Sequence, residues 1–299
     1  MSGLCLRILG AAAGGGLPQW NCGCPNCDAA RAGIIPSQTQ SSLAVSADER
    51  TWALLNASPD IGRQLLDTPA LYPTGPRQSP LRAVLLTNGD IDHVAGLLTL
   101  REKQPFALYA TPEIHAVLAA NPIFQALDEA LVERRGVSLD TPREILPGLS
   151  VTLFAVPGKV PLYLEGAKVE TDLEGEQTVG VELSNGTTRT AYIPGCARIT
   201  PRLSARLEGL DVLFFDGTLW DDDEMIRAGL GQKTGRRMGH MPISGAEGSI
   251  AALAGLAIGR KIYVHMNNTN PVLVPGSPER EEAEAAGWTI GQDGMEVRP

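Results

Sequence analysis

Short apolar runs that end in turn-forming residues recur along almost the whole chain, and they limit the fold more than any other feature. Each is long enough for one strand and is closed by Gly, Pro, Asn or Asp. The expected strands lie within 4–10, 41–48, 51–58, 81–88, 106–111, 149–158, 178–185, 188–195, 210–218 and 261–268. This pattern predicts at least one substantial β-sheet.

Segments with helical spacing lie between these strands and late in the chain, within 60–68, 92–103, 111–121, 244–259 and 277–286. The fourth begins with Ser244 and Glu247 at the spacing of a capping box. The strands look like antiparallel runs with helices between them, and no long flexible linker divides the chain. We therefore expect an α/β fold with two sheets covered by helices on their outer faces, in one domain spanning 1–299.

The charge and the lack of long apolar segments restrict the partners. The chain has 34 acidic and 25 basic residues and a net charge of −9, which disfavours nucleic acid and anionic lipid. No apolar run approaches the length of a bilayer span, and the first residues do not resemble a secretory leader. We expect a cytoplasmic protein without membrane insertion, and a homodimer is compatible with the sequence.

Three of the five cysteines, Cys22, Cys24 and Cys27, lie within six residues as C-x-C-x-x-C. This spacing can offer three thiolates to one tetrahedral ion, which predicts a structural zinc loop near 20–28. His240 is the expected fourth ligand, because it stands just before an expected helix and the other histidines lie in a helix or follow apolar runs. The alternative is three reduced thiols in a Gly/Pro-rich loop.

A second cluster of metal-ligand residues is expected where strands end. Asp90, Asp92 and His93 follow the run 81–87, Asp216 follows 210–215, and His265 follows 261–264. Carboxylates beside imidazoles suit a divalent metal. Each residue also has an ordinary explanation, because Asp favours loops and helix starts and a histidine can be a hydrogen-bonded core residue.

This second cluster resembles the metallo-β-lactamase superfamily. Its H-x-H-x-D-H loop corresponds to Asn88, Asp90, Asp92 and His93, so that asparagine and aspartate replace the first two histidines. The later P-G-H turn carries Lys159 in place of histidine, whereas the later Asp and His positions are kept. The resemblance implies a four-layer αββα sandwich.

Over nearly the entire chain, the motifs GGGLPQWNCGCPNC, QSSLAVSAD, NASPDI and TNGDIDHVAGLL are similar to the branch of this superfamily that takes part in pyrroloquinoline quinone (PQQ) biosynthesis. That resemblance implies a precursor peptide containing a glutamate and a tyrosine, a fragment of it, or PQQ itself as partner. A related phosphodiesterase branch has a structural zinc on C-x-C-x-x-C and a distant histidine, which supports the cysteine loop with His240.

The replaced residues change the expected chemistry from two metals to one. Asn88 is a weak ligand, and a protonated Lys159 would repel a second ion by about 4 kcal/mol at about 4 Å. Asp92, His93 and His265 remain as two imidazoles and a carboxylate, the ligand set of non-haem Fe2+ oxygenases. We expect Fe2+, with zinc or another divalent ion as the alternative, and hydroxylation of the precursor tyrosine.

Asp90 and Asp216 are expected to assist catalysis, either as metal ligands or from behind them. Carboxylates of the substrate are expected to meet basic residues, although a solvated loop is the more common explanation for Lys233, Arg236 and Arg237. These basic residues are Lys159, Lys233, Arg236 and Arg237. Two other functions stay open: a metal-dependent hydrolase with Asp90 as general base, and a soluble carrier that helps PQQ or its precursor reach the periplasm.

Overall fold

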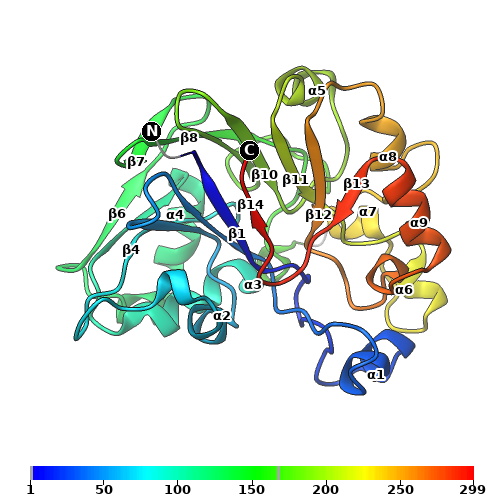
Figure 1. Cartoon of the computed structure of the whole chain (residues 1–299), viewed down its shortest axis with the longest axis horizontal. Helices are drawn as coiled ribbons and strands as arrows, with labels where there is room; N and C mark the ends of the chain where they lie inside the picture. The colour runs from blue at the N-terminus through cyan, green and yellow to red at the C-terminus, as the bar shows by residue number, and fades with distance from the viewer. Residues whose placement is uncertain (1–2, 167–168) are drawn as a thin grey trace.

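Two seven-stranded sheets form the centre of the computed structural model, which describes residues 3–166 and 169–299. Figure 1 shows the sheets side by side, with α2 and α4 on the outer side of one and α8 and α9 on the outer side of the other. This arrangement is the four-layer αββα sandwich. Within the described ranges, no helix is long and apolar enough to cross a membrane.

The first sheet has the strand order β14-β1-β2-β3-β4-β5-β6. Strands β14, β1, β2 and β3 are antiparallel neighbours, and β3 to β6 are parallel. The bounds are β1 Cys5–Gly10, β2 Ser42–Ser46, β3 Trp52–Leu55, β4 Leu81–Leu85, β5 Phe106–Ala110, β6 Val132–Gly136 and β14 Glu296–Val297. The last strand therefore lies beside the first, and the two ends of the chain share one sheet.

The second sheet has the order β13-β12-β11-β10-β9-β8-β7, with β7 to β10 antiparallel and β10 to β13 parallel. The bounds are β7 Arg143–Leu146, β8 Leu149–Ala155, β9 Val179–Ser184, β10 Arg189–Ile193, β11 Val212–Asp216, β12 Arg260–Val264 and β13 Trp288–Ile290. Every residue of β11 is buried, as expected for a parallel strand covered on both faces.

The helices are short, and they connect strands or cover the sheets. Their bounds are α1 Pro25–Arg31, α2 Ile61–Asp67, α3 Ile91–Val94, α4 Pro112–Ala120, α5 Pro201–Leu207, α6 Glu224–Arg227, α7 Gly235–Met238, α8 Ser249–Ala252 and α9 Pro278–Ala285. The 3-10 turns are η1 Pro69–Leu71, η2 Ala95–Arg101, η3 Pro122–Ala126, η4 Leu162–Leu164 and η5 Pro271–Leu273. Figure 1 shows α1 projecting from the lower end of the sandwich.

All ten strands expected from the sequence are present, with ends that agree within a few residues. Two expectations were wrong in detail. Half of the pairings between neighbouring strands are parallel, and each parallel pair is joined by a connection that contains a helix: α2, α3, α4, α5, α8 or α9. The predicted capping box is also absent: Ser244 donates to the carbonyl of Trp220, and α8 begins only after Gly248.

The register of the second sheet brings distant residues together at one edge. Strands β11 and β12 are parallel, and Asp216 pairs with Val264, so His265 lies just beyond Asp216. Strand β4 of the first sheet ends at Leu85, and α3 with Asp92 and His93 follows after a short loop. The candidate site lies at the edge where these strands end.

Candidate metal centre

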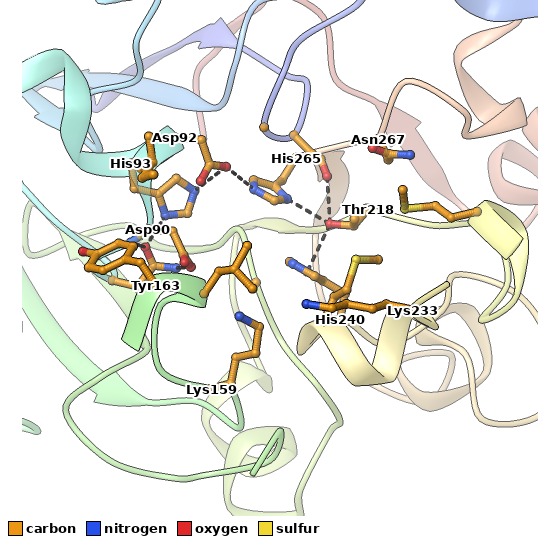
Figure 2. A pocket seen from close by; sticks show the side chains of 18 of the residues that line it. Asp90, Asp92, His93, Lys159, Tyr163, Thr218, Lys233, His240, His265 and Asn267 are labelled. Atoms are coloured by element: carbon orange, nitrogen blue, oxygen red, sulfur yellow. Dashed lines mark hydrogen bonds and ion pairs between the residues drawn. The ribbon is translucent and has the colours of Figure 1, made fainter. Parts of the chain in front are cut away.

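Asp92, His93 and His265 form one cluster of potential metal ligands, with one ligand atom from each within 4.8 Å of the others. Asp92 Oδ2 lies 3.1 Å from His265 Nε2 and 3.8 Å from His93 Nε2. Figure 2 shows the carboxylate of Asp92 between the two imidazoles. The structure thus brings together the three residues that the sequence predicts as ligands.

A hydrogen bond fixes the orientation of the His93 ring. Its Nδ1 lies 2.7 Å from Asn88 Oδ1, and because a carbonyl oxygen only accepts, Nδ1 carries the proton. His93 Nε2 is therefore the basic nitrogen. It is buried and has no hydrogen-bond partner, an arrangement that is costly without a ligand. This unpartnered nitrogen, facing Asp92, fits a metal ion.

The charges at this centre shift the protonation of its members. Burial lowers the pKa of His93 to about 4, so the ring is neutral near pH 7. The pKa of Asp92 is far below its usual range because burial is outweighed by His93 and His265. Burial opposes charge on His265, but its hydrogen bond to Asp92 raises the pKa overall. Burial and the charge of Asp92 raise the pKa of Asp90.

Asn88 connects this cluster to Asp90. Its Nδ2 donates to Asp90 Oδ2 at 2.9 Å, and its Oδ1 also accepts from the backbone N–H of Asp90 at 3.0 Å. The amide is therefore committed to His93 and Asp90 through both its oxygen and its nitrogen. Asn88 acts here as an orienting group and not as a ligand.

Asp216 and His240 form a second group of potential ligands that shares His265 with the first. His240 Nδ1 donates to Asp216 Oδ2 at 2.7 Å, and the rings of His240 and His265 stack with centroids 5.2 Å apart. Thr218, which the sequence analysis missed, lies between them: its hydroxyl is 2.9 Å from His265 Nδ1 and 2.6 Å from Asp216 Oδ1. Its position two residues after Asp216 is the available sequence signal.

The prediction that His240 completes the cysteine cluster was wrong. Figure 2 places His240 in the pocket beside Thr218, and its ligand atoms group with those of Asp216 and His265. The reason is local: α7 ends at Met238, Gly239 takes a left-handed conformation with φ 89°, and the chain then turns back so that Met241 N–H bonds the carbonyl of Cys196 near β10. The position of His240 just before an expected helix does not reveal this turn, which is why the sequence misassigned the residue.

The sulfurs of Cys22, Cys24 and Cys27 do converge, within 4.8 Å of one another. Burial raises the pKa of Cys27 to about 11; three sulfurs this close suit one tetrahedral cation that stabilises them as thiolates, which fits zinc. The group facing all three is the amide of Asn268, with Nδ2 at 3.3 Å from Cys22, 3.4 Å from Cys24 and 3.3 Å from Cys27. A turned amide would present its oxygen to the ion.

A cavity of about 460 Å³ opens over the first cluster. Figure 2 shows Lys159 and Lys233 at its wall, away from Asp92. The lining residues include Gln19, Asn88, Asp90, Asp92, His93, Lys159, Leu162, Tyr163, Glu165, Thr218, Met225, Lys233, Met238, His240, His265 and Asn267. The pocket therefore combines a polar metal-ligand end with apolar and basic walls.

Of the four basic residues expected to bind substrate, Lys159 and Lys233 line this pocket. Arg237 is not among the lining residues, and it pairs with Glu165, which is, at 2.9 Å. Arg236 is not brought to the pocket: it pairs at 2.6 Å with Glu247, an exposed residue. The expectation for Arg236 was therefore wrong, because successive residues of α7 point in different directions.

The comparisons with known proteins agree with this fold and site. Residues 51–266 match the family model described as the β-lactamase superfamily domain. A diphosphatase of the PhnP family, 20% identical over 99% of this chain and 98% of that chain, has a TM-score of 0.70 and supports the fold. The chain belongs to the metallo-β-lactamase superfamily.

More similar relatives define the branch. Coenzyme PQQ synthesis protein B of Methylobacterium radiotolerans is 59% identical, covering 97% of this chain and 98% of the relative, and that of Ruegeria pomeroyi is 60% identical with the same coverage. The crystal structure of Zn2+-bound PqqB from Methylobacterium extorquens is 56% identical, covers 99% of this chain and 100% of that chain, and has a TM-score of 0.97. Within the superfamily, the chain belongs to the PqqB family of PQQ biosynthesis proteins.

Proposed function

We propose that this PqqB-family protein is an Fe2+-dependent oxygenase that hydroxylates the tyrosine ring of the Glu/Tyr precursor peptide, or of its fragment, in PQQ biosynthesis. The observation that carries the proposal is the unpartnered, buried Nε2 of His93, which faces Asp92 beside His265. Two imidazoles and one carboxylate form the three-ligand set of non-haem iron oxygenases. Bound Fe2+ would supply O2 activation at positions that the protein leaves free.

The remaining pocket residues suit an aromatic substrate. Leu162, Met225 and Met238 provide apolar walls that can cover a ring and exclude water. Tyr163 closes one side, where its hydroxyl donates to the carbonyl of Gly89 at 2.7 Å. Lys159 lies on the same side as Asp90 and contributes positive charge. In this proposal these groups position the ring and its carboxylates, and Asn88 holds His93 in the tautomer that binds metal.

The hydroxylation has to balance. One oxygen atom of O2 enters the ring carbon–hydrogen bond, the other becomes water, and two electrons with two protons come from a reductant. The test therefore supplies ascorbate.

Protein reconstituted anaerobically with Fe2+ receives tyrosine-containing peptides of several lengths, including Glu-Tyr, and then O2. We expect a gain of about 16 Da, and incorporation of label from ¹⁸O2, in the tyrosine-containing product.

A His93→Ala variant serves as the loss-of-metal control, and Zn2+-loaded protein separates the rival function. The second group, Asp216, His240 and His265, supports metal-dependent hydrolysis as the alternative, because it offers a further place where zinc could activate water. Zinc-dependent cleavage without O2 would select that alternative. Tight PQQ binding without any turnover would select the carrier. Lack of oxygen incorporation with well-loaded iron would reject the hydroxylase.

A further inference from the structure

Three cations, two of which line the pocket, converge on one carboxylate. Glu165 lies 3.0 Å from Lys159, 2.9 Å from Arg237 and 3.8 Å from Lys233. Its side chain is 8% exposed, and the hydrogen bond from Arg237 together with Lys159 lowers its pKa to about 2. Glu165 is therefore ionised, and it is shared among three donors.

The charges in this cluster do not cancel. Within residues 3–166 and 169–299, Glu165 is the single carboxylate that forms an ion pair with any of these three cations. One negative charge against three leaves an excess of two positive charges beside the cavity, in a chain whose net charge is −9. Lys233, with the longest contact and 42% exposure, is the least committed of the three.

The cavity thus has two chemically different ends. The metal-ligand end carries Asp92 with His93 and His265, and the basic end carries Lys159 and Lys233. The lining also includes three apolar side chains, Leu162, Met225 and Met238. A molecule that matches both ends has an aromatic ring and at least one carboxylate held away from the reacting carbon.

We infer that the basic end is a carboxylate-binding site for an aromatic di- or tricarboxylic acid, and that Glu165 competes with the ligand for the same three cations. The ligand's carboxylate replaces Glu165 on Lys159 and Lys233, the two cations that line the pocket, which bind a carboxylate with charge-assisted hydrogen bonds. The inference rests on the proposed function only for its choice of a PQQ-pathway ligand. It concerns binding and needs no turnover.

The competing explanation is that Glu165 is a strut that holds the three cations in place for the ligand. The two explanations predict opposite signs. If Glu165 competes, then Glu165→Gln frees the cations and tightens the binding of a carboxylate. If it is a strut, the same substitution lets the cations move apart and weakens binding.

Isothermal titration calorimetry distinguishes them, with PQQ, a tricarboxylate, and its trimethyl ester as probes. We expect Glu165→Gln to bind PQQ at least about threefold more tightly and Lys233→Gln to bind it about tenfold more weakly, the effect of one charge-assisted hydrogen bond. Glu247→Gln is the control and should bind PQQ like the natural protein. It removes the partner of Arg236, which lies on the same helix as Arg237 but outside the pocket. The ester should bind weakly to all four proteins and without dependence on residue 165.

Weaker PQQ binding by Glu165→Gln, in protein whose circular dichroism and melting temperature match those of Glu247→Gln, overturns the competition. Equal affinity for PQQ and its ester, or no PQQ binding at all, overturns the carboxylate site itself. Neither result depends on iron or O2. Failure of hydroxylation with the expected binding pattern would therefore reject the proposed reaction and leave this site in place.

Discussion

At the scale of single residues, Asn88 decides which nitrogen of His93 is free for a metal: its amide oxygen accepts from Nδ1 at 2.7 Å, and Nε2 is left without a partner. The replacement of the first motif histidine by Asn88 predicts that this position is a poor ligand, but the spacing of residues does not reveal that the amide oxygen contacts His93. His240 was assigned by elimination among four histidines, and elimination ignores the turn at Gly239 that directs the ring towards Asp216. Contacts between distant loops depend on the packing of the whole sandwich.

Asn88→Ala should weaken metal binding at the Asp92 cluster by about 10- to 100-fold, the usual effect of losing a group that orients a ligand. The reason is that His93 then lacks the acceptor that fixes its proton on Nδ1. Competition with a chromophoric chelator measures the affinity. Asn121→Ala removes a comparable amide at the end of α4, where it bonds the carbonyl of Val117, and should leave the affinity unchanged. Equal affinities for both variants would contradict the orienting role.

At the scale of secondary-structure elements, strands with continuous apolar runs were predictable because buried parallel strands need apolar side chains on both faces. Among the strands outside the ten expected ones, β6 and β7 have the sequences VERRG and REIL, which carry charges, and they lie at the edges of their sheets, where one side is open. The predicted capping box is absent because the Ser244 hydroxyl donates to the carbonyl of Trp220 and does not cap a helix. Tertiary contacts decide such short elements.

Glu224 links α6 to the segment after β12, and its burial predicts a pH-dependent stability. It is 6% exposed, accepts from the Trp220 N–H at 2.6 Å and from the Thr269 hydroxyl, and burial raises its pKa to about 7. At a pH below the pKa that Glu224 has in the unfolded chain, the side chain is protonated in both the folded and the unfolded state. As pH rises from about 4.5 to 7, the unfolded state loses its proton first, so folding stability falls by about 3 kcal/mol in total.

Denaturant unfolding between pH 5 and 8 tests this, with the difference between the natural protein and Glu224→Gln as the readout. That difference isolates Glu224 from Asp293, whose pKa burial also raises, to about 6. The stability advantage of the natural protein should shrink as pH rises. Glu129→Gln, at an exposed position, is the matched control. A constant difference for Glu224→Gln would place its pKa outside this range.

At the scale of the whole molecule, one segment near the end of the chain joins the two candidate metal sites. Residues 265–270 carry His265 at the pocket, Asn267 in its lining and Asn268 against the three cysteine sulfurs. Asn26 of α1 donates to the carbonyls of both Asn268 and Asn270. The sandwich itself was predictable through the family resemblance, whereas this connection between the cysteine loop and the C-terminal segment was not.

Removal of zinc from the cysteine loop should therefore destabilise the protein and loosen the pocket. An ion present at about a thousand times its Kd stabilises the folded state by about 4 kcal/mol, and at about 2 °C per kcal/mol for a chain of this length the melting temperature falls by roughly 8 °C. Hydrogen exchange should rise in 22–27 and also in 265–270, because Asn268 loses its restrained position. Cys24→Ser should reproduce both effects without chelator, whereas Cys5→Ser, in β1 and remote from the loop, should leave exchange in 265–270 unchanged. If the two sites are linked, the loss of contacts at Asn268 should also increase exchange in its neighbours up to His265. Faster exchange confined to 22–27 would therefore show that the two sites are independent.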